Sequence, residues 1–303
     1  MIADTERGIV VRHQSGFYTI RANGRVITCV LRGRLKRRSI PGDVISIGDY
    51  VQFAVLTDGS GVIEEIEPRK SELVRLTPTP RGDYRQILLS NPDQIVIVFA
   101  CASPDPHLRM LDRFLVIAEK QRLKAVIIAN KADLVSKREA RRIFEIYPPL
   151  GYRVIYTSAV KNQGIDELRE VLTGKLSALA GPSGVGKSSL MNRMQPGLGL
   201  NVREISQRKD RGRHTTVVRE LFPLEGGGYV ADLPGLRKLS LWDTEPEELD
   251  GYFPELRDLV KYCQFNDCTH FEEPGCAVIQ AVQDGRVNPE RYESYLRMRA
   301  GDE

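Results

Sequence analysis

The stretch SALAGPSGVGKSSL, residues 177–190, decides the fold of the central part of the chain. It begins as an apolar strand, turns at closely spaced glycines and continues as a helix. Within it, GPSGVGKS at residues 181–188 fits the pattern G-x-x-x-x-G-K-[ST] at every fixed position. Glycines let backbone N–H groups converge on phosphate oxygens, and the helix that follows presents the positive end of its dipole to them. The stretch therefore predicts a P-loop in an α/β domain rather than a purely structural glycine turn.

Each part of this loop has an expected role. Lys187 is expected to reach the β- and γ-phosphates and to take part in catalysis, and Ser188 to offer its hydroxyl to Mg²⁺. The remaining residues expected to contact the nucleotide are Gly181, Pro182, Ser183, Gly184, Val185, Gly186 and Ser189.

The string NKAD, residues 130–133, ends the apolar strand KAVIIAN, and open α/β sheets bind ligands at the carboxyl ends of their strands. The Asp133 carboxylate can accept hydrogen bonds from guanine N1–H and from the exocyclic amine, a pair that adenine does not offer. Asn130 and Lys131 would brace the loop and pack beside the ring, and Ala132 completes the motif. A four-residue string such as NKAD occurs often by chance. Its position at the end of a buried strand is what makes it informative.

TSA, residues 157–159, also ends a strand, and Ser158 with the backbone N–H of Ala159 is expected to meet guanine O6. A third strand end carries DLPG, residues 232–235, where Asp232 would hold Mg²⁺ through water and the Gly235 N–H would touch the γ-phosphate.

GRHTT, residues 212–216, lies where a loop with a Mg²⁺-binding threonine is expected. We select Thr216, with Thr215 as the alternative. A lone Thr-Thr pair before a strand reflects no more than β-propensity, so this assignment depends on the other motifs. Together the motifs predict a GTP site.

The motifs stand in an unusual order, since a Ras-like domain runs P-loop, Thr, DxxG, NKxD and SA. Joining the ends of such a domain and cutting it elsewhere gives the order of this chain and keeps the fold, because domain termini usually lie close together. The segment after DLPG then leads directly into the C-terminal region.

That region contains Cys263-x4-Cys268-x-His270-x5-Cys276. Three thiolates and one imidazole satisfy a closed tetrahedral Zn²⁺ site, which predicts one structural zinc ion, with redox cysteines as the alternative. The chain has five cysteines, an odd number that makes a poor disulfide framework. Nearby cations would suit contact with RNA: Lys261, Arg286, Arg291, Arg297 and Arg299.

Residues 1–70 alternate apolar and polar positions between turn signals, which predicts a small β-barrel of OB type or of SH3-like type. Between Arg21 and Gly42 the sequence has seven Lys and Arg and no acid, a run that suits a polyanion or simply a solvated face. Residues 69–92 are rich in Pro, Arg and Thr and lack periodicity, so we interpret them as a linker.

The predicted domains are therefore an OB-type barrel (1–70), an α/β P-loop GTPase domain with a mostly parallel sheet in permuted order (71–242), and a mostly helical zinc-binding domain (243–303).

The 303 residues are 41% hydrophobic with a formal net charge of +4, which suits a globular protein. No run of eighteen apolar residues occurs, and MIADTERGIV does not resemble a signal peptide. We expect a cytoplasmic monomer.

This combination of barrel, permuted GTPase motifs and Cys-Cys-His-Cys module resembles the ribosome small-subunit-dependent GTPase A family (RsgA, also called YjeQ) over essentially the whole chain. The resemblance implies a GTPase that binds the small (30S) ribosomal subunit through its 16S rRNA during late maturation. It also implies hydrolysis stimulated by the subunit and linked to the release of other assembly factors. Leu233 stands where the family often has Ser or Thr, a difference we expect to matter little.

One catalytic group is missing from the pattern. Ras-type enzymes place a glutamine after the DxxG glycine to orient the attacking water, and here that residue is Leu236. His214 is the candidate replacement, as the resemblance also implies; the alternative is an exposed loop histidine without a role in catalysis. The alternative function is a GTP-binding RNA chaperone or tether without significant turnover.

Overall fold

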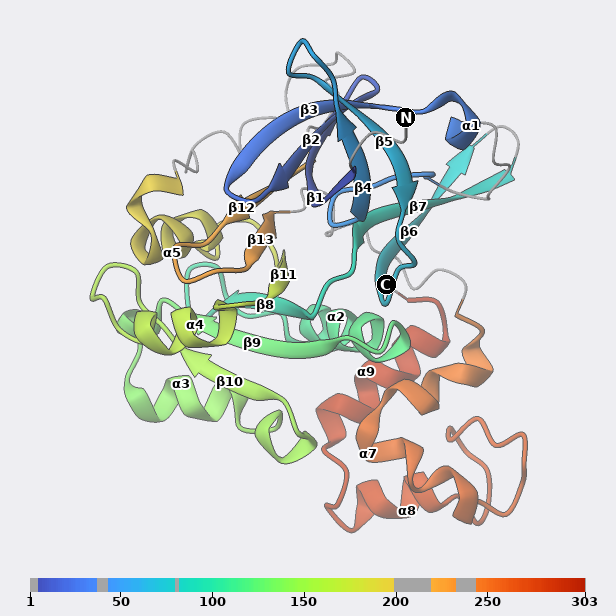
Figure 1. Cartoon of the computed structure of the whole chain (residues 1–303). Helices are drawn as coiled ribbons and strands as arrows, with labels where there is room; N and C mark the ends of the chain where they lie inside the picture. The colour runs from blue at the N-terminus through green and yellow to red at the C-terminus, as the bar shows by residue number, and fades with distance from the viewer. Residues whose placement is uncertain (1–4, 37–42, 80–81, 199–218, 233–243, 303) are drawn as a thin grey trace.

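The computed structural model describes residues 5–36, 43–79, 82–198, 219–232 and 244–302. Figure 1 shows a barrel of strands packed above an α/β sheet, with a helical C-terminal unit beside the sheet. No helix in these ranges is long and apolar enough to cross a membrane.

The N-terminal barrel is of the OB type. Its strands lie in the order β1-β2-β3-β5-β4, and β1 also pairs with β4, which closes the barrel. The parallel pairing of β3 with β5 gives the Greek-key order of an OB fold, which decides between the two barrels that the sequence left open. Its elements are β1 (Thr5–Gln14), β2 (Phe17–Ala22), β3 (Arg25–Leu31), α1 (Gly33–Lys36), β4 (Tyr50–Val55) and β5 (Gly61–Ile66).

The segment interpreted as a linker is in fact a β-hairpin, so that prediction was wrong. The strands β6 (Glu72–Thr79) and β7 (Gly82–Ser90) pair antiparallel, and they bury Leu73 and Leu89 completely. The residues at the turn end of the two strands, TPTPRG at 77–82, are rich in proline and polar groups. They outweighed the short apolar stretches at the far end of each strand, and the segment therefore resembled a linker. Arg69, which donates to the buried Asp49 carboxylate at 2.7 Å, fixes the join with the barrel.

The central sheet runs β10-β9-β8-β11-β13-β12, and all its strands are parallel except β12, which is antiparallel to β13. The chain leaves the middle at β8, reaches the edge at β10, returns to the middle at β11 and continues toward the other edge. The sheet is thus doubly wound. Its strands are β8 (Gln94–Ala100), β9 (Lys124–Asn130), β10 (Arg153–Tyr156), β11 (Leu176–Ala180), β12 (Arg219–Pro223) and β13 (Tyr229–Asp232).

Helices cover both faces of this sheet, as expected for continuous apolar strands (Figure 1). Alternate residues of β8 point to opposite sides: Ile97 and Phe99 pack in one buried cluster with Phe114 of α2, whereas Val98 packs in a second cluster with Leu190 of α5. The helices are α2 (Leu108–Lys120), α3 (Lys137–Phe144), α4 (Ile165–Leu172) and α5 (Lys187–Met194), with short 3₁₀ turns at Ala132–Leu134, Pro148–Leu150 and Pro196–Leu198.

The barrel and the central sheet are continuous. Strand β12 pairs antiparallel with β1, with Arg12 opposite Glu220 and His13 opposite Arg219. Through this pairing the strands of the barrel and of the central sheet form one sheet of eleven strands, and β6 and β7 form a separate sheet.

The C-terminal unit packs against α2 of the GTPase domain. Val116 of α2 joins a buried cluster with Phe253, Leu256 and Tyr295, which anchors the unit to the sheet. Its elements are the 3₁₀ segment Pro246–Tyr252, α7 (Pro254–Arg257), the 3₁₀ segment Val260–Tyr262, α8 (Ala277–Gln283) and α9 (Pro289–Arg299).

Arg291 of α9 joins the two domains instead of facing solvent. Its guanidinium is 1% exposed, donates to Asp112 of α2 at 2.7 Å and to Glu255 at 2.6 Å, and leaves no group free for RNA. The Tyr147 hydroxyl also donates to Asp112, at 3.0 Å. The expectation that Arg291 contacts RNA is therefore wrong.

Replacing Arg291 with methionine is expected to lower the free energy of unfolding by about 3–5 kcal/mol, because two carboxylates would stay buried without a cation. Urea titration followed by circular dichroism measures this change. Arg286→Met is the control: it removes an exposed arginine that pairs with Asp284, and should cost at most about 0.5 kcal/mol. A loss below about 1 kcal/mol for Arg291→Met would contradict the role given to this ion pair.

Candidate functional site

The predicted nucleotide residues gather at the switch point of the sheet. Strands β8 and β11 are neighbours. From β8 the chain continues to β9 and β10 on one side, and from β11 it continues to β12 and β13 on the other side. Open α/β sheets bind ligands in the crevice at the carboxyl ends of two such strands. A cavity of about 220 Å³ lies there between the loop after β8 and the P-loop. Its lining includes Phe99, Met110, Pro182, Ser183 and Val185.

The P-loop needs glycine at two close approaches. Gly181 has φ 128° and Gly186 has φ 92°, both in the region that glycine favours. A Cβ on Gly181 would lie 2.1 Å from the Val98 carbonyl oxygen, and one on Gly186 would lie 2.5 Å from Asn130 Nδ2. The fixed glycines of the pattern are thus explained by the fit of the loop against β8 and β9.

Lys187 holds its ammonium group at the mouth of the loop. Its Nζ donates to the carbonyl oxygens of Gly181 and Pro182, at 2.8 and 2.6 Å. Ser188 follows it in the first turn of α5, where the backbone N–H groups have no partner within the helix. This arrangement presents positive charge to an anion in the loop.

The guanine motif touches the P-loop although 55 residues separate them. The Asn130 amide nitrogen donates to the Val185 carbonyl oxygen at 2.7 Å, and the Thr157 hydroxyl donates to Asn130 Oδ1 at 3.0 Å. Lys131 Nζ donates to the carbonyl oxygen of Ser103, in the loop after β8. Thr157 was not assigned a role from the sequence, because a threonine at a strand end carries no signal until its partner is known.

Asp133 is half-buried and makes no hydrogen bond or ion pair within the described parts of the chain. The Ala132 N–H donates to the Thr157 carbonyl at 3.0 Å, which holds the motif beside TSA. Asp133 therefore follows the carboxyl end of β9, and its carboxylate has no partner among the described residues.

The residues around TSA also hold their loop in place. The Ser158 hydroxyl accepts from the Lys161 N–H at 3.0 Å, and Ser158 exchanges two backbone hydrogen bonds with Gln163. Ala159, directly after this bridge, is partly buried against the cluster that includes Leu190.

The predicted magnesium ligands are only partly within the described residues. Asp232 ends β13 and is opposite Leu179 of β11, so its backbone lies beside the strand that leads into the P-loop. Thr216, Gly235 and His214 lie outside the described ranges.

The four predicted metal ligands converge in the C-terminal unit. Their ligand atoms all lie within 4.8 Å of one another. The Cys263 Sγ lies 3.6 Å from His270 Nδ1 and 3.9 Å from Cys276 Sγ, and His270 Nδ1 lies 3.4 Å from Cys276 Sγ. A tetrahedral ion bound at ordinary zinc distances would separate two sulfurs by about 3.8 Å and sulfur from nitrogen by about 3.6 Å. The cluster, which also contains Cys268, fits such an ion.

The chemistry of the donors suits a cation. Burial raises the pKa of Cys268 to about 12 and raises that of Cys276. A coordinated metal ion reverses this shift and keeps the thiols deprotonated. The cluster can therefore bind a metal ion.

Asp250 orients the histidine of this cluster. Its Oδ2 lies 3.1 Å from His270 Nε2, so that Nδ1 faces the three sulfurs. A carboxylate behind a metal-bound histidine fixes both the tautomer and the angle of the ring. The Tyr292 and Tyr295 hydroxyls donate to the carbonyls of His270 and Thr269, which ties the cluster to α9. Sequence reasoning missed Asp250, which lies 20 residues before its histidine.

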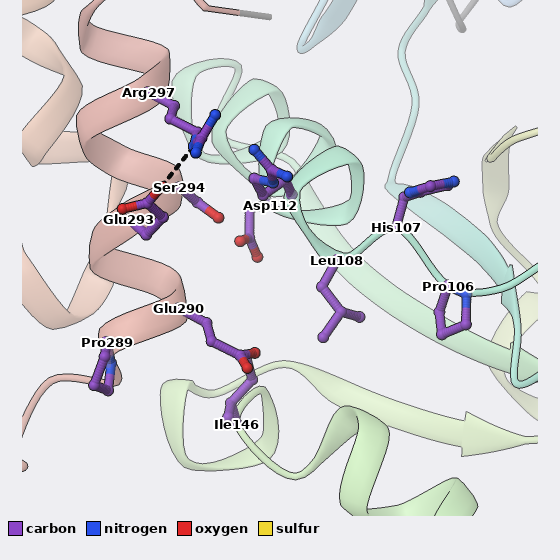
Figure 2. A pocket seen from close by; sticks show the side chains of 11 residues that line it. Pro106, His107, Leu108, Asp112, Ile146, Pro289, Glu290, Glu293, Ser294 and Arg297 are labelled. Carbon is purple, nitrogen blue, oxygen red and sulfur yellow. Dashed lines mark hydrogen bonds and ion pairs between the residues drawn. The ribbon is translucent and has the colours of Figure 1, made fainter.

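A second cavity, of about 510 Å³, lies between α2 and α9 and contains none of the predicted nucleotide residues. Figure 2 shows the Ser294 side chain pointing toward the neighbouring Asp112 carboxylate, with Arg297 paired to Glu293 beside them. Of the residues at this junction, Asp112 joins the two domains through Arg291, whereas Arg297 and Glu293 pair within α9.

A P-loop bound to a guanine motif at the switch point of an α/β sheet, with the base motif first in the chain, defines a circularly permuted GTPase. Models of two families match: the RsgA GTPase over residues 66–242 and the RsgA N-terminal domain over residues 7–63. The chain therefore belongs to the RsgA GTPase family and is a GTP hydrolase.

Relatives match over nearly the full length. Two relatives are called "Small ribosomal subunit biogenesis GTPase RsgA", and each is 45% identical to this chain. The protein of Gemmatimonas aurantiaca aligns over 96% of each chain. That of Moorella thermoacetica aligns over 95% of this chain and 94% of the relative. The crystal structure of YjeQ from Thermotoga maritima aligns with a TM-score of 0.81 and 38% identity over 99% of each chain. That of YloQ, a circularly permuted GTPase, aligns with a TM-score of 0.75 and 33% identity over 99% of this chain and 95% of YloQ.

Proposed function

We propose that this GTPase binds the small ribosomal subunit through its 16S rRNA and assists its late maturation. The observation that carries the proposal is the full-length match to relatives named for small-subunit biogenesis. The match covers all three parts of the chain: the barrel, the GTPase domain and the C-terminal unit. A cytoplasmic location would follow, because subunits assemble there.

The face of β2 and β3 is the surface of the barrel that best suits RNA. Phe17 is 57% exposed and lies opposite Val30, which is 39% exposed, while Arg21 lies opposite Val26. Aromatic and aliphatic groups beside an arginine can stack on unpaired bases, and OB folds bind oligonucleotides on this face.

The basic run of the barrel contributes less positive charge than its sequence suggests. Arg25 is paired with Glu6, and both Arg32 and Arg34 are paired with Glu64. Two carboxylates thus offset part of the charge of three of the seven cations, and the run keeps an excess of positive charge. Electrostatic attraction to a polyanion and stacking on the β2–β3 face therefore both support RNA contact.

At the nucleotide site we propose that Lys187 binds the β- and γ-phosphates and that Asp133 reads guanine. Ser188, Thr216 and Asp232 are the proposed Mg²⁺ ligands, and Mg²⁺ would neutralise charge on the phosphates. The C-terminal cluster is proposed to hold one structural Zn²⁺, which matches its donor set and spacing.

We propose that turnover is slow in the free protein and rises on the subunit, with His214 as the group that orients water because Leu236 cannot. Phosphate release from wild type and from His214→Ala, with and without purified small subunits, tests this. Equal stimulated rates would remove His214 from the mechanism. If small subunits stimulate neither wild type nor His214→Ala, the alternative function, a GTP-binding RNA chaperone or tether without significant turnover, would be favoured.

Sedimentation with small subunits under GDP, GTP and a non-hydrolysable analogue tests the binding itself. We expect the analogue to give the most co-sedimented protein and GDP the least, because hydrolysis is proposed to accompany release of other assembly factors and then of the GTPase. Equal amounts under all three conditions would contradict a nucleotide-controlled cycle.

Replacing Asp133 with asparagine is expected to weaken GDP binding by at least about 10²-fold, since two hydrogen bonds to a carboxylate are lost. Xanthosine diphosphate should bind better to the variant than to wild type, because xanthine has a carbonyl where guanine has its amine. Titration of both nucleotides measures the change. Asp166→Asn, an exposed carboxylate in α4, is the matched control, and an unchanged preference for GDP in Asp133→Asn would contradict the assignment.

A further inference from the structure

Three large aromatic side chains of the C-terminal unit face solvent around the metal cluster. Tyr262 is 68% exposed, Phe271 is 59% exposed and Phe265 is 42% exposed. Tyr262 precedes the ligand Cys263, and Phe271 follows the ligand His270. The ligand atoms of Cys263 and His270 lie 3.6 Å apart, so Tyr262 and Phe271 are attached to the backbone next to the metal cluster, and Phe265 lies two residues after Cys263. We call these three exposed rings the aromatic rim.

The rim is held in place and does not contribute to the core. The Glu273 carboxylate accepts hydrogen bonds from the N–H groups of Thr269 and Phe271, at 2.8 and 2.9 Å, which fixes the loop that carries Phe271. The core of the unit is made by other rings, Phe253 and Tyr295, both fully buried. Exposed aromatic groups on an ordered loop are typical of interaction surfaces.

The charges around the rim are mainly negative. Asp258, Asp267 and Glu272 are exposed, and their carboxylates have no partner within the described ranges. The one cation in this stretch, Lys261, places its Nζ 5.0 Å from the centroid of the Tyr262 ring. That contact shows that a cation can approach the face of a rim aromatic.

The arginines of this unit are engaged elsewhere. Arg286 pairs with Asp284, Arg297 with Glu293, and Arg299 with Glu247. With these arginines paired and exposed acids beside the rings, the rim suits a cationic ligand better than a phosphate. Contact of Lys261, Arg286, Arg297 and Arg299 with RNA stays a prediction.

We propose that the aromatic rim binds an arginine- or lysine-rich polypeptide segment of a partner. Aromatic faces attract guanidinium and ammonium groups, and the neighbouring carboxylates would add attraction and specificity against RNA. The inference rests on the exposed groups of the rim and does not require the proposed function.

The test is fluorescence anisotropy of the full, metal-loaded chain with a labelled peptide of alternating arginine and glycine. The same peptide with glutamine in place of arginine is the first comparison, and a single-stranded oligouridine is the second. We expect the arginine peptide to bind at least about tenfold more tightly than the glutamine peptide, and the double variant Phe265→Ser/Phe271→Ser to lose about tenfold in affinity for it.

A second double variant, Asp267→Asn/Glu272→Gln, keeps the rings and should also weaken peptide binding. Leu56→Ser, an exposed apolar residue of the barrel that has no assigned role, is the control and should leave it unchanged. Metal content of one ion per chain verifies that each variant is folded. The proposal is overturned if both double variants bind the arginine peptide as tightly as wild type does. It is also overturned if the double variants bind oligouridine more weakly but still bind the peptide normally.

Discussion

Replacing Lys187 with alanine is expected to lower GTP turnover by about 10²–10³-fold, the cost of removing one preorganised donor from developing negative charge. The loop itself holds the lysine, because its Nζ donates to the carbonyl oxygens of Gly181 and Pro182. Steady-state phosphate release in the presence of purified small subunits gives the turnover, and titration with labelled GDP gives the affinity.

Lys175→Ala is the matched control for this experiment. Lys175 lies just before β11, at the opposite end of the strand from the P-loop, and its Nζ donates to the Val171 carbonyl at 3.0 Å. The control should keep turnover within about threefold of wild type, as expected for a surface group of small energetic effect. Turnover of Lys187→Ala in that same range would refute the assignment of the P-loop lysine.

Removing the metal ion is expected to unfold much of the C-terminal unit. Structural zinc sites contribute about 10–16 kcal/mol of apparent binding free energy in small domains, comparable to the whole stability of a typical domain. Cys276→Ser should therefore abolish stoichiometric metal and raise hydrogen exchange over residues 244–302. Cys276 is also the N-cap of α8, where its Sγ accepts from the Ile279 N–H at 3.5 Å.

Cys29→Ala provides the comparison, because Cys29 is a buried cysteine of the barrel far from the cluster. It should retain one metal ion per chain and ordinary exchange protection in the C-terminal unit. Elemental analysis and exchange mass spectrometry report both quantities. Unchanged metal content in Cys276→Ser would mean that this cysteine is not a ligand.

Sequence patterns located the chemistry of this protein well because phosphate and metal binding demand particular residue types at fixed spacings. Gly181 and Gly186 recur in the P-loop pattern since a Cβ at either position would collide with a neighbouring strand or with Asn130. The spacing of the cysteines and histidine likewise predicted the metal cluster. Continuous apolar strands predicted a sheet covered on both faces.

Contacts between distant parts of the chain left no comparable pattern. Arg291 and Asp112 are 179 residues apart, and nothing near either one shows that a buried ion pair joins them. The same holds for the Asp250 carboxylate behind His270. Strand order was also inaccessible, because the pairing of β3 with β5 depends on closure of the barrel and not on local composition.

The pairing of β1 with β12 has a consequence for the integrity of the enzyme. A strand at the edge of a sheet offers unpaired N–H and C=O groups to any other chain, which makes it a site of self-association. In this protein the barrel caps that edge, so the nucleotide-binding half relies on its neighbour for protection. A shortened version that begins after the barrel would leave β12 uncovered and would be prone to aggregate, even with every GTP-binding motif intact.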